Sequence, residues 1–137
     1  MKKRQIGSIE ILGWVGMLLW GLVTILRGCD IQGGAAYQRF LDNGPNVGAA
    51  WAMTLVGKIL WMLISKRRYT VAGHLSWCAG IAVLALASEV FHDLFLNAPF
   101  DGNDMLVTVL AQMVMIWVPM MVKDKCFMQE REAGERI

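Results

Sequence analysis

The sequence predicts an all-α integral membrane protein, a four-helix bundle with both termini on the cytoplasmic side. Three observations lead there: four long apolar segments, a one-sided distribution of Lys and Arg, and an apolar composition. Of the 137 residues, 56% are hydrophobic and 18% charged, with a mean hydropathy of +0.47, which is too apolar for an ordinary soluble domain. The length fits a single transmembrane domain, residues 1–137. The net charge of +2 is too small to favour a nucleic-acid partner.

The four apolar segments are predicted to be transmembrane helices. They span residues 9–26, 47–64, 71–91 and 105–122. About 20 apolar residues, at roughly 1.5 Å per residue, cross a hydrocarbon core of about 30 Å. The segments are apolar nearly all round, and they lack the alternation of barrel strands. Helices are therefore expected, because each satisfies its own backbone hydrogen bonds inside lipid.

The basic residues predict the orientation of the bundle. Most of them fall at the N-terminus, between the second and third segments, and in the tail 123–137: residues 2–4, 66–68, 123 and 125. The third connection, residues 92–104, carries three aspartates and no Lys or Arg. The positive-inside rule then places both termini in the cytoplasm. A bias of this strength is usual in the bacterial inner membrane, which is the predicted location.

The first segment also resembles a secretory signal, because a basic start precedes an apolar run. Residues 26–29, Leu-Arg-Gly-Cys, resemble a bacterial lipobox, except that Arg27 departs from the small or aliphatic residue of that motif. No small-x-small cleavage pattern follows the segment, so an uncleaved anchor is expected. Cys29 would lie outside the cell membrane, Cys78 within the membrane and Cys126 in the cytoplasm. No intramolecular disulfide is therefore expected.

The first outer connection, residues 27–46, is predicted to hold a short helix lying in the membrane interface. Asp30 would cap it, and the motif Asn43-Gly44-Pro45 would end it. Its apolar face would consist of Tyr37, Phe40 and Leu41. The alternative is a loop whose aromatic side chains anchor it among the headgroups.

Small residues at four-residue spacing predict where helices touch. The third segment has Ala72, Ser76 and Gly80, and the second has Gly48 and Ala52. Such spacing lets helix backbones approach closely in lipid. The partner helix would belong either to this chain or to a neighbouring one.

Lys58 is the one basic residue well inside a predicted span. Ionisable groups at that depth are costly and often functional. Lys58 also lies near the cytoplasmic end of its helix, so its side chain could reach the interface or pair with Glu10 of the first segment. The sequence leaves both a structural role and a relay role open.

Glu89, His92 and Asp93 share one helix face near the outer surface. They could relay protons or form a polar helix end. Two histidines in the whole chain are too few for a convincing zinc site, so no metal is predicted. Residues 101–104, Asp-Gly-Asn-Asp, resemble part of a calcium loop but lack its glutamate, and are predicted to cap the fourth helix.

The sequence contains no P-loop, GxSxG, HExxH or CxxC motif, so no enzyme activity and no cofactor are predicted. The preferred hypothesis is a non-enzymatic structural or assembly subunit of a larger membrane complex. Its partners would be membrane lipids and either further copies of itself or other subunits. The alternative is an oligomeric channel or transporter subunit that uses Lys58 together with Glu89 and His92.

One segment narrows the first hypothesis. Residues 55–83 form an apolar hairpin with the basic connection Lys66-Arg67-Arg68, and this arrangement resembles conjugative pilin subunits. The resemblance implies polymerisation with lipid and a role in secretion or conjugation. The chain departs from that pattern by its additional spans and its outer loop.

Overall fold

The computed structural model describes residues 7–29, 31–65, 69–96 and 99–122, which form four α-helices. They are α1 (Ser8–Gly28), α2 (Ala35–Ser65), α3 (Val71–Leu96) and α4 (Gly102–Met121). All four are long and apolar enough to cross a membrane. The predicted all-α class with four apolar helices is confirmed, and it indicates an integral membrane protein. The predicted orientation, with both termini in the cytoplasm, depends on basic residues outside the described ranges and stays a prediction.

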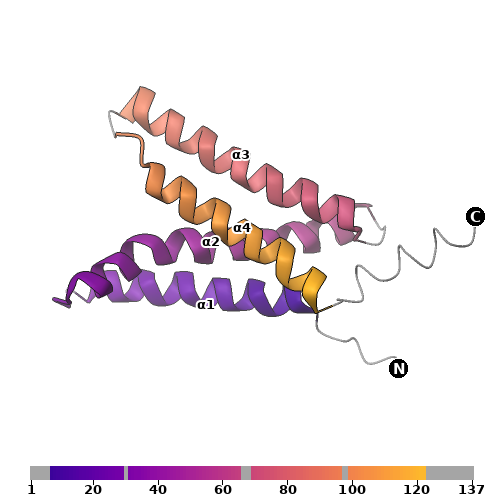
Figure 1. The fold of residues 1–137 in the computed structure, drawn as a ribbon, viewed down its shortest axis with the longest axis horizontal. Coiled ribbons are helices and arrows are strands. Elements are labelled where there is room, and N and C mark those ends of the chain that lie inside the picture. The colour runs from indigo at the N-terminus through magenta and orange to yellow at the C-terminus, as the bar shows by residue number, and fades with distance from the viewer. Residues whose placement is uncertain (1–6, 30, 66–68, 97–98, 123–137) are drawn as a thin grey trace, which may run out of the picture.

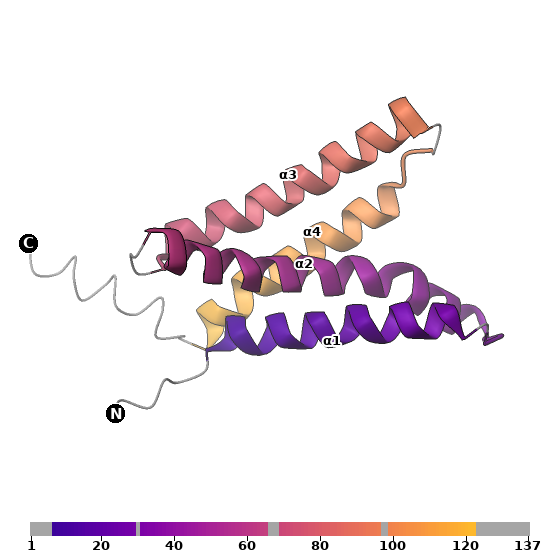
Figure 2. The ribbon, with the colours of Figure 1, turned by 180° about the vertical axis from the view of Figure 1, so that it is seen from behind.

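The helices form an antiparallel arrangement in which α1 and α2 lie along each other (Figure 1). We call the end where α1 begins and α4 ends the Ser8 end, and the opposite end the Gly28 end. Helix α4 packs against both α2 and α3, whereas α2 and α3 contact each other less. Figures 1 and 2 both show α3 diverging from α2 toward the Gly28 end. The bundle is therefore a tight helix pair with a second pair splayed from it.

Small residues bring α1 and α2 together. A Cβ atom added at Gly16 would lie 2.8 Å from the carbonyl oxygen of Gly48, and one added at Gly48 would lie 2.8 Å from the carbonyl oxygen of Gly16. Ala52 also approaches this contact through its backbone nitrogen, 3.0 Å from the added Gly16 Cβ. The predicted packing positions Gly48 and Ala52 thus serve contact within the chain, because only small residues allow this approach.

Helix α2 corrects the prediction for residues 27–46. The helix runs unbroken from Ala35 through Pro45 to Ser65, so the predicted stop at Asn43-Gly44-Pro45 is wrong. Two contacts explain the continuation. Gly44 packs closely against Val23 of α1, and Arg27 Nη2 donates a hydrogen bond of 2.7 Å to the Leu41 carbonyl oxygen. That carbonyl has no helical donor, because Pro45 lacks an N–H.

The remaining parts of that prediction have different outcomes. Leu41 is buried, Tyr37 is half-buried and Phe40 is exposed, so these three side chains do not share one environment. A separate interfacial helix is not observed among the described residues, where this segment is the first third of α2. The predicted cap, Asp30, lies outside the described residues.

Helix α4 begins at Gly102, three residues before the predicted start, and residues 101–104 provide the predicted cap. Asp101 is its N-cap, and its side chain accepts hydrogen bonds from the backbone N–H groups of Asn103 at 2.8 Å and Asp104 at 3.4 Å. This satisfies two donors that the helix itself leaves free. The Asn103 side chain also donates to the Asn43 side chain at 2.7 Å, which ties the start of α4 to α2.

The α1–α2 contact predicts the effect of enlarging its glycines. We expect Gly48→Leu to destabilise the protein by at least about 2 kcal/mol, since overpacking here meets backbone atoms rather than flexible side chains. Gly21→Leu is the matched control, because a Cβ at Gly21 would meet nothing within 4 Å. Denaturant unfolding of the detergent-solubilised protein measures both. Equal stability of the two variants would contradict the assigned contact.

Candidate functional site

The buried polar side chains gather in the half of the bundle nearer the Ser8 end. Four of them come from three different helices: Thr54 and Lys58 of α2, His74 of α3 and Gln112 of α4. Polar groups at such positions need partners, because lipid and packed side chains supply none. Their partners therefore reveal how the core is organised.

Lys58 forms an ion pair with Glu10 of α1. The distance between Lys58 Nζ and Glu10 Oε1 is 2.8 Å, and the side chains are 3% and 21% exposed. The other Glu10 oxygen, Oε2, accepts the backbone N–H of Gly7 at 3.0 Å, which caps α1. Lys58 Nζ also lies 5.8 Å from the centre of the Tyr69 ring, within cation–π range. The pairing expected from the sequence is thus formed.

His74 completes the hydrogen bonding of α4. Its Nε2 lies 3.0 Å from the carbonyl oxygen of Met115, a carbonyl with no helical donor because Pro119 stands four residues later. A carbonyl only accepts, so Nε2 carries the proton and the Nδ1 of a neutral ring accepts the Tyr69 hydroxyl at 3.0 Å. His74 is fully buried, and it joins α3 to the interrupted turn of α4.

Thr54 and Gln112 connect α2 to α4, farther from the Ser8 end than Lys58. The Thr54 hydroxyl lies 3.2 Å from Gln112 Oε1, and Gln112 Nε2 donates to the carbonyl oxygen of Ala50 at 3.1 Å. The buried Cys78 thiol of α3 lies close to Thr54. It also lies 3.7 Å from His74 Nε2. Polar side chains thus link α2, α3 and α4 through the core.

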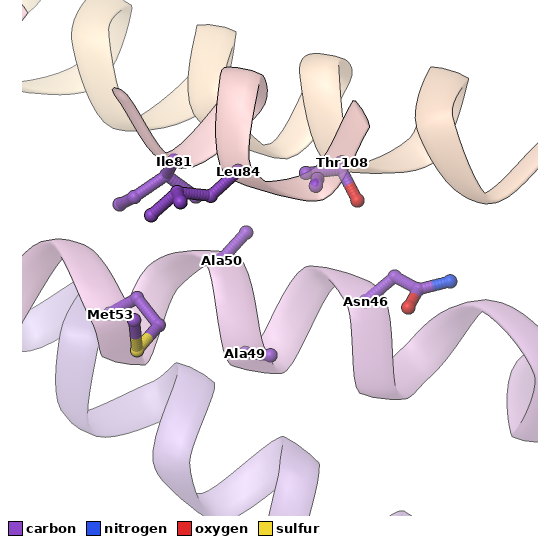
Figure 3. A pocket seen from close by; sticks show the side chains of 8 residues that line it. Asn46, Ala49, Ala50, Met53, Ile81, Leu84 and Thr108 are labelled. Carbon is purple, nitrogen blue, oxygen red and sulfur yellow. The ribbon is translucent and has the colours of Figure 1, made fainter. Parts of the chain in front are cut away.

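A pocket of about 260 Å³ lies between α2, α3 and α4, on the Gly28 side of these polar groups. Figure 3 shows Met53 and Ile81 at one end of it and Asn46 and Thr108 at the other. The remaining lining residues are Ala49, Ala50, Leu84 and Ala85. Its lining comes from the middle of α2, the middle of α3 and the first half of α4.

The predicted cluster at the end of α3 is only partly assembled. Glu89 Oε2 accepts the backbone N–H of Asp101 at 3.3 Å, which ties α3 to the start of α4. His92 and Asp93 are exposed. Among the described residues, no three His, Cys, Asp or Glu side chains are close enough to hold a metal ion. Glu89 thus contributes to a helix junction, while a relay role for the cluster stays a prediction.

The small residues of α3 face away from the other helices. Ala72, Ser76 and Gly80 are all exposed, and a Cβ at Gly80 would meet nothing within 4 Å. This differs from Gly48 and Ala52, which pack against α1. The predicted packing role of the α3 residues therefore has no partner within the described part of the chain and stays a prediction about a neighbouring helix.

The four apolar helices define the class of protein, a polytopic α-helical membrane protein. Comparison with known proteins adds nothing to this, since no family model, curated protein or solved structure matches the chain. The site consequently rests on its own geometry. His74, Thr54 and Gln112 were not predicted as site residues from the sequence. Two features of the sequence could have indicated His74. It is a polar residue inside an apolar span, and Pro119 leaves the carbonyl of Met115 without a helical donor.

The Lys58–Glu10 pair predicts a double-mutant cycle. Lys58→Met should destabilise the protein by about 3 kcal/mol, because it leaves the Glu10 carboxylate without its cation in a largely buried position. Adding Glu10→Gln to Lys58→Met should recover part of that loss. Unfolding midpoints in detergent for the two single variants and the double variant provide the measurement. Strictly additive losses would mean that the pair contributes no coupling energy.

A second cycle tests the role of His74. His74→Phe should cost about 1–3 kcal/mol, mainly because the Met115 carbonyl loses its donor. In a Pro119→Ala background the cost should be smaller by about 1 kcal/mol, since residue 119 then supplies the missing N–H. The loss of the Tyr69 hydrogen bond is common to both backgrounds and cancels. An undiminished cost in the Pro119→Ala background would refute the assignment.

Proposed function

We propose that this protein is a non-enzymatic structural or assembly subunit of a larger membrane complex, and that it docks on a neighbouring transmembrane helix through the outward face of α3. We place it in the bacterial inner membrane with both termini in the cytoplasm, on the basis of its Lys and Arg distribution. A role in secretion or conjugation is the narrower form of this proposal.

The observation that carries the proposal is the exposed line of small residues on α3: Ala72, Ser76 and Gly80. Lipid tails are as apolar as leucine, so close helix association in a membrane depends on small residues that let backbones approach. Helix α1 uses its glycines for that purpose against α2. The corresponding residues of α3 have no helix opposite them in the described part of the chain.

The burial of the four helices supports the same surface. Within its most apolar stretch, α3 is 6% buried, against 22%, 33% and 28% for α1, α2 and α4. Helix α3 therefore presents more of its surface to the surroundings than any other helix. A second helix covering this face would give α3 a packing environment similar to that of its neighbours.

The alternative, an oligomeric channel or transporter subunit, relies on Lys58 with Glu89 and His92. The geometry favours it less. The Lys58 ammonium is held by Glu10 toward the Ser8 end, whereas Glu89 and His92 lie near the Gly28 end of α3. A shared path would have to cross most of the bundle between them.

Site-specific crosslinking tests the docking surface. In a background with Cys29→Ser and Cys126→Ser, Ser76→Cys should give one discrete crosslinked product in native membranes with a short bifunctional thiol reagent. Gly80→Leu added to this variant should reduce the product, because a bulky side chain separates the helices. Leu18→Cys on α1, which is 73% exposed, is the control for random encounters in lipid. Equal crosslinking at positions 76 and 18 would sink the proposal.

A further inference from the structure

The pocket between α2, α3 and α4 separates its polar and apolar groups along its length. Met53 and Ile81 form the apolar end, and Asn46 and Thr108 form the end nearer the Gly28 end of the bundle (Figure 3). Three alanines between them leave room rather than filling it. A cavity with this polarity fits an elongated ligand that has one apolar and one polar end.

The Thr108 hydroxyl has no hydrogen-bond partner among the described residues. The residue is 8% exposed and lines the pocket. Two other helix threonines donate to the carbonyl four residues earlier, Thr24 at 2.8 Å and Thr54 at 2.9 Å. Among the described residues, the Thr108 hydroxyl has no such bond. Because Thr108 lines the pocket, its hydroxyl is available to a polar group of a ligand there.

Four carboxylates lie near the polar end of the pocket, outside its lining. Asn46, which lines the pocket, is close to the Asp104 side chain, whose charged neighbours are Asp101, Glu89 and Asp42. None of these four carboxylates forms an ion pair within the described part of the chain. The same residues do not form a metal site. The charge complement is therefore an organic cation.

We propose that this pocket binds a single-tailed amphiphile with an ammonium head. The aliphatic tail lies against Met53 and Ile81, and the ammonium group pairs with Asp104 while a neighbouring polar atom of the head reaches Thr108. The size of the pocket selects a single tail, since about 260 Å³ is below the roughly 300–1,000 Å³ of drug-sized sites. Anionic heads are disfavoured, because they would face four carboxylates.

The pocket is open rather than enclosed. A ligand dissolved in the bilayer therefore reaches it sideways, tail first. This site lies on the inner side of α3, facing α2. It is distinct from the outward line of small residues proposed for docking, so either inference stands without the other.

Photolabelling in phosphatidylcholine nanodiscs tests the ligand class. The probe is an alkyltrimethylammonium with a diazirine at the tail end, and its counterpart is the same tail with a sulfate head. Labelled residues are mapped by mass spectrometry, and labelling at Met53 and Ile81 is divided by labelling at lipid-facing Leu18 to remove differences in partitioning. The ammonium probe should exceed the sulfate probe by roughly fivefold or more in this ratio, as one charge contact gives.

Two matched pairs of variants locate the head and the tail. Asp104→Asn should abolish most of the head preference, whereas Asp93→Asn, an exposed carboxylate at the same end of α3, should leave it unchanged. Ala85→Leu should lower labelling at Met53 by filling the pocket, whereas Ala87→Leu, two residues along and exposed, should not.

Three results would overturn the proposal. The first is equal labelling ratios for the ammonium and sulfate probes in the wild-type protein, a comparison that needs no variant to fold. The second is labelling that ignores Ala85→Leu in a variant with wild-type helix content by circular dichroism. The third is a diazirine phosphatidylcholine that labels Met53 and Ile81 as strongly as the ammonium probe, independently of Asp104, which would mean that ordinary bilayer lipid fills the pocket.

Discussion

Every backbone carbonyl inside a bilayer needs a donor, and two prolines in this chain remove one each. Pro45 leaves the Leu41 carbonyl without a helical partner, and Pro119 does the same to Met115. Both gaps are closed from a neighbouring helix, by Arg27 at 2.7 Å and by His74 at 3.0 Å. A carbonyl left without a donor in one helix thus accepts a hydrogen bond from a side chain of its neighbour, and this bond joins the two helices. One such bond joins α1 to α2 near the Gly28 end, and the other joins α3 to α4 near the Ser8 end.

These bonds, with the contacts around them, explain the uneven shape of the bundle. Helices α1 and α2 are held along their length by glycines, by Arg27 and by the Lys58–Glu10 pair. Helix α3 is tied to α4 at His74 near one end and through Glu89 at the other. It is bonded to α2 through the Trp77 indole N–H, which donates to the Met53 carbonyl oxygen at 3.0 Å. Beyond that point α3 leaves α2, and the pocket opens.

The parts of the fold that could be predicted are those set by local pattern. Four apolar runs predicted the four helices, and the turn of residues 101–104 was predicted to cap the fourth because its residue types favour such turns. Glu10 was named as a partner for Lys58 because their depths match. The continuity of α2 could not be predicted, since Gly44-Pro45 ends most helices. The helix continues because Arg27, 14 positions before Leu41, donates a hydrogen bond to the Leu41 carbonyl. His74 was not predicted for the same reason, because its hydrogen-bond partner is the Met115 carbonyl, 41 residues later in the chain.

Both proposed surfaces lie on α3, which is the least buried of the four helices. A ligand in the pocket needs α3 to stand apart from α2, because Ile81 and Leu84 form one wall. A partner helix on the outward face contacts Gly80, a single residue before that wall. A ligand or partner shifts the position of a helix only as far as its affinity differs between the two positions. If the docked partner favours the splayed position, it should strengthen amphiphile binding, and by reciprocity the amphiphile should strengthen docking to the same degree. The angle between α3 and α2 would then couple partner docking to ligand binding in the pocket.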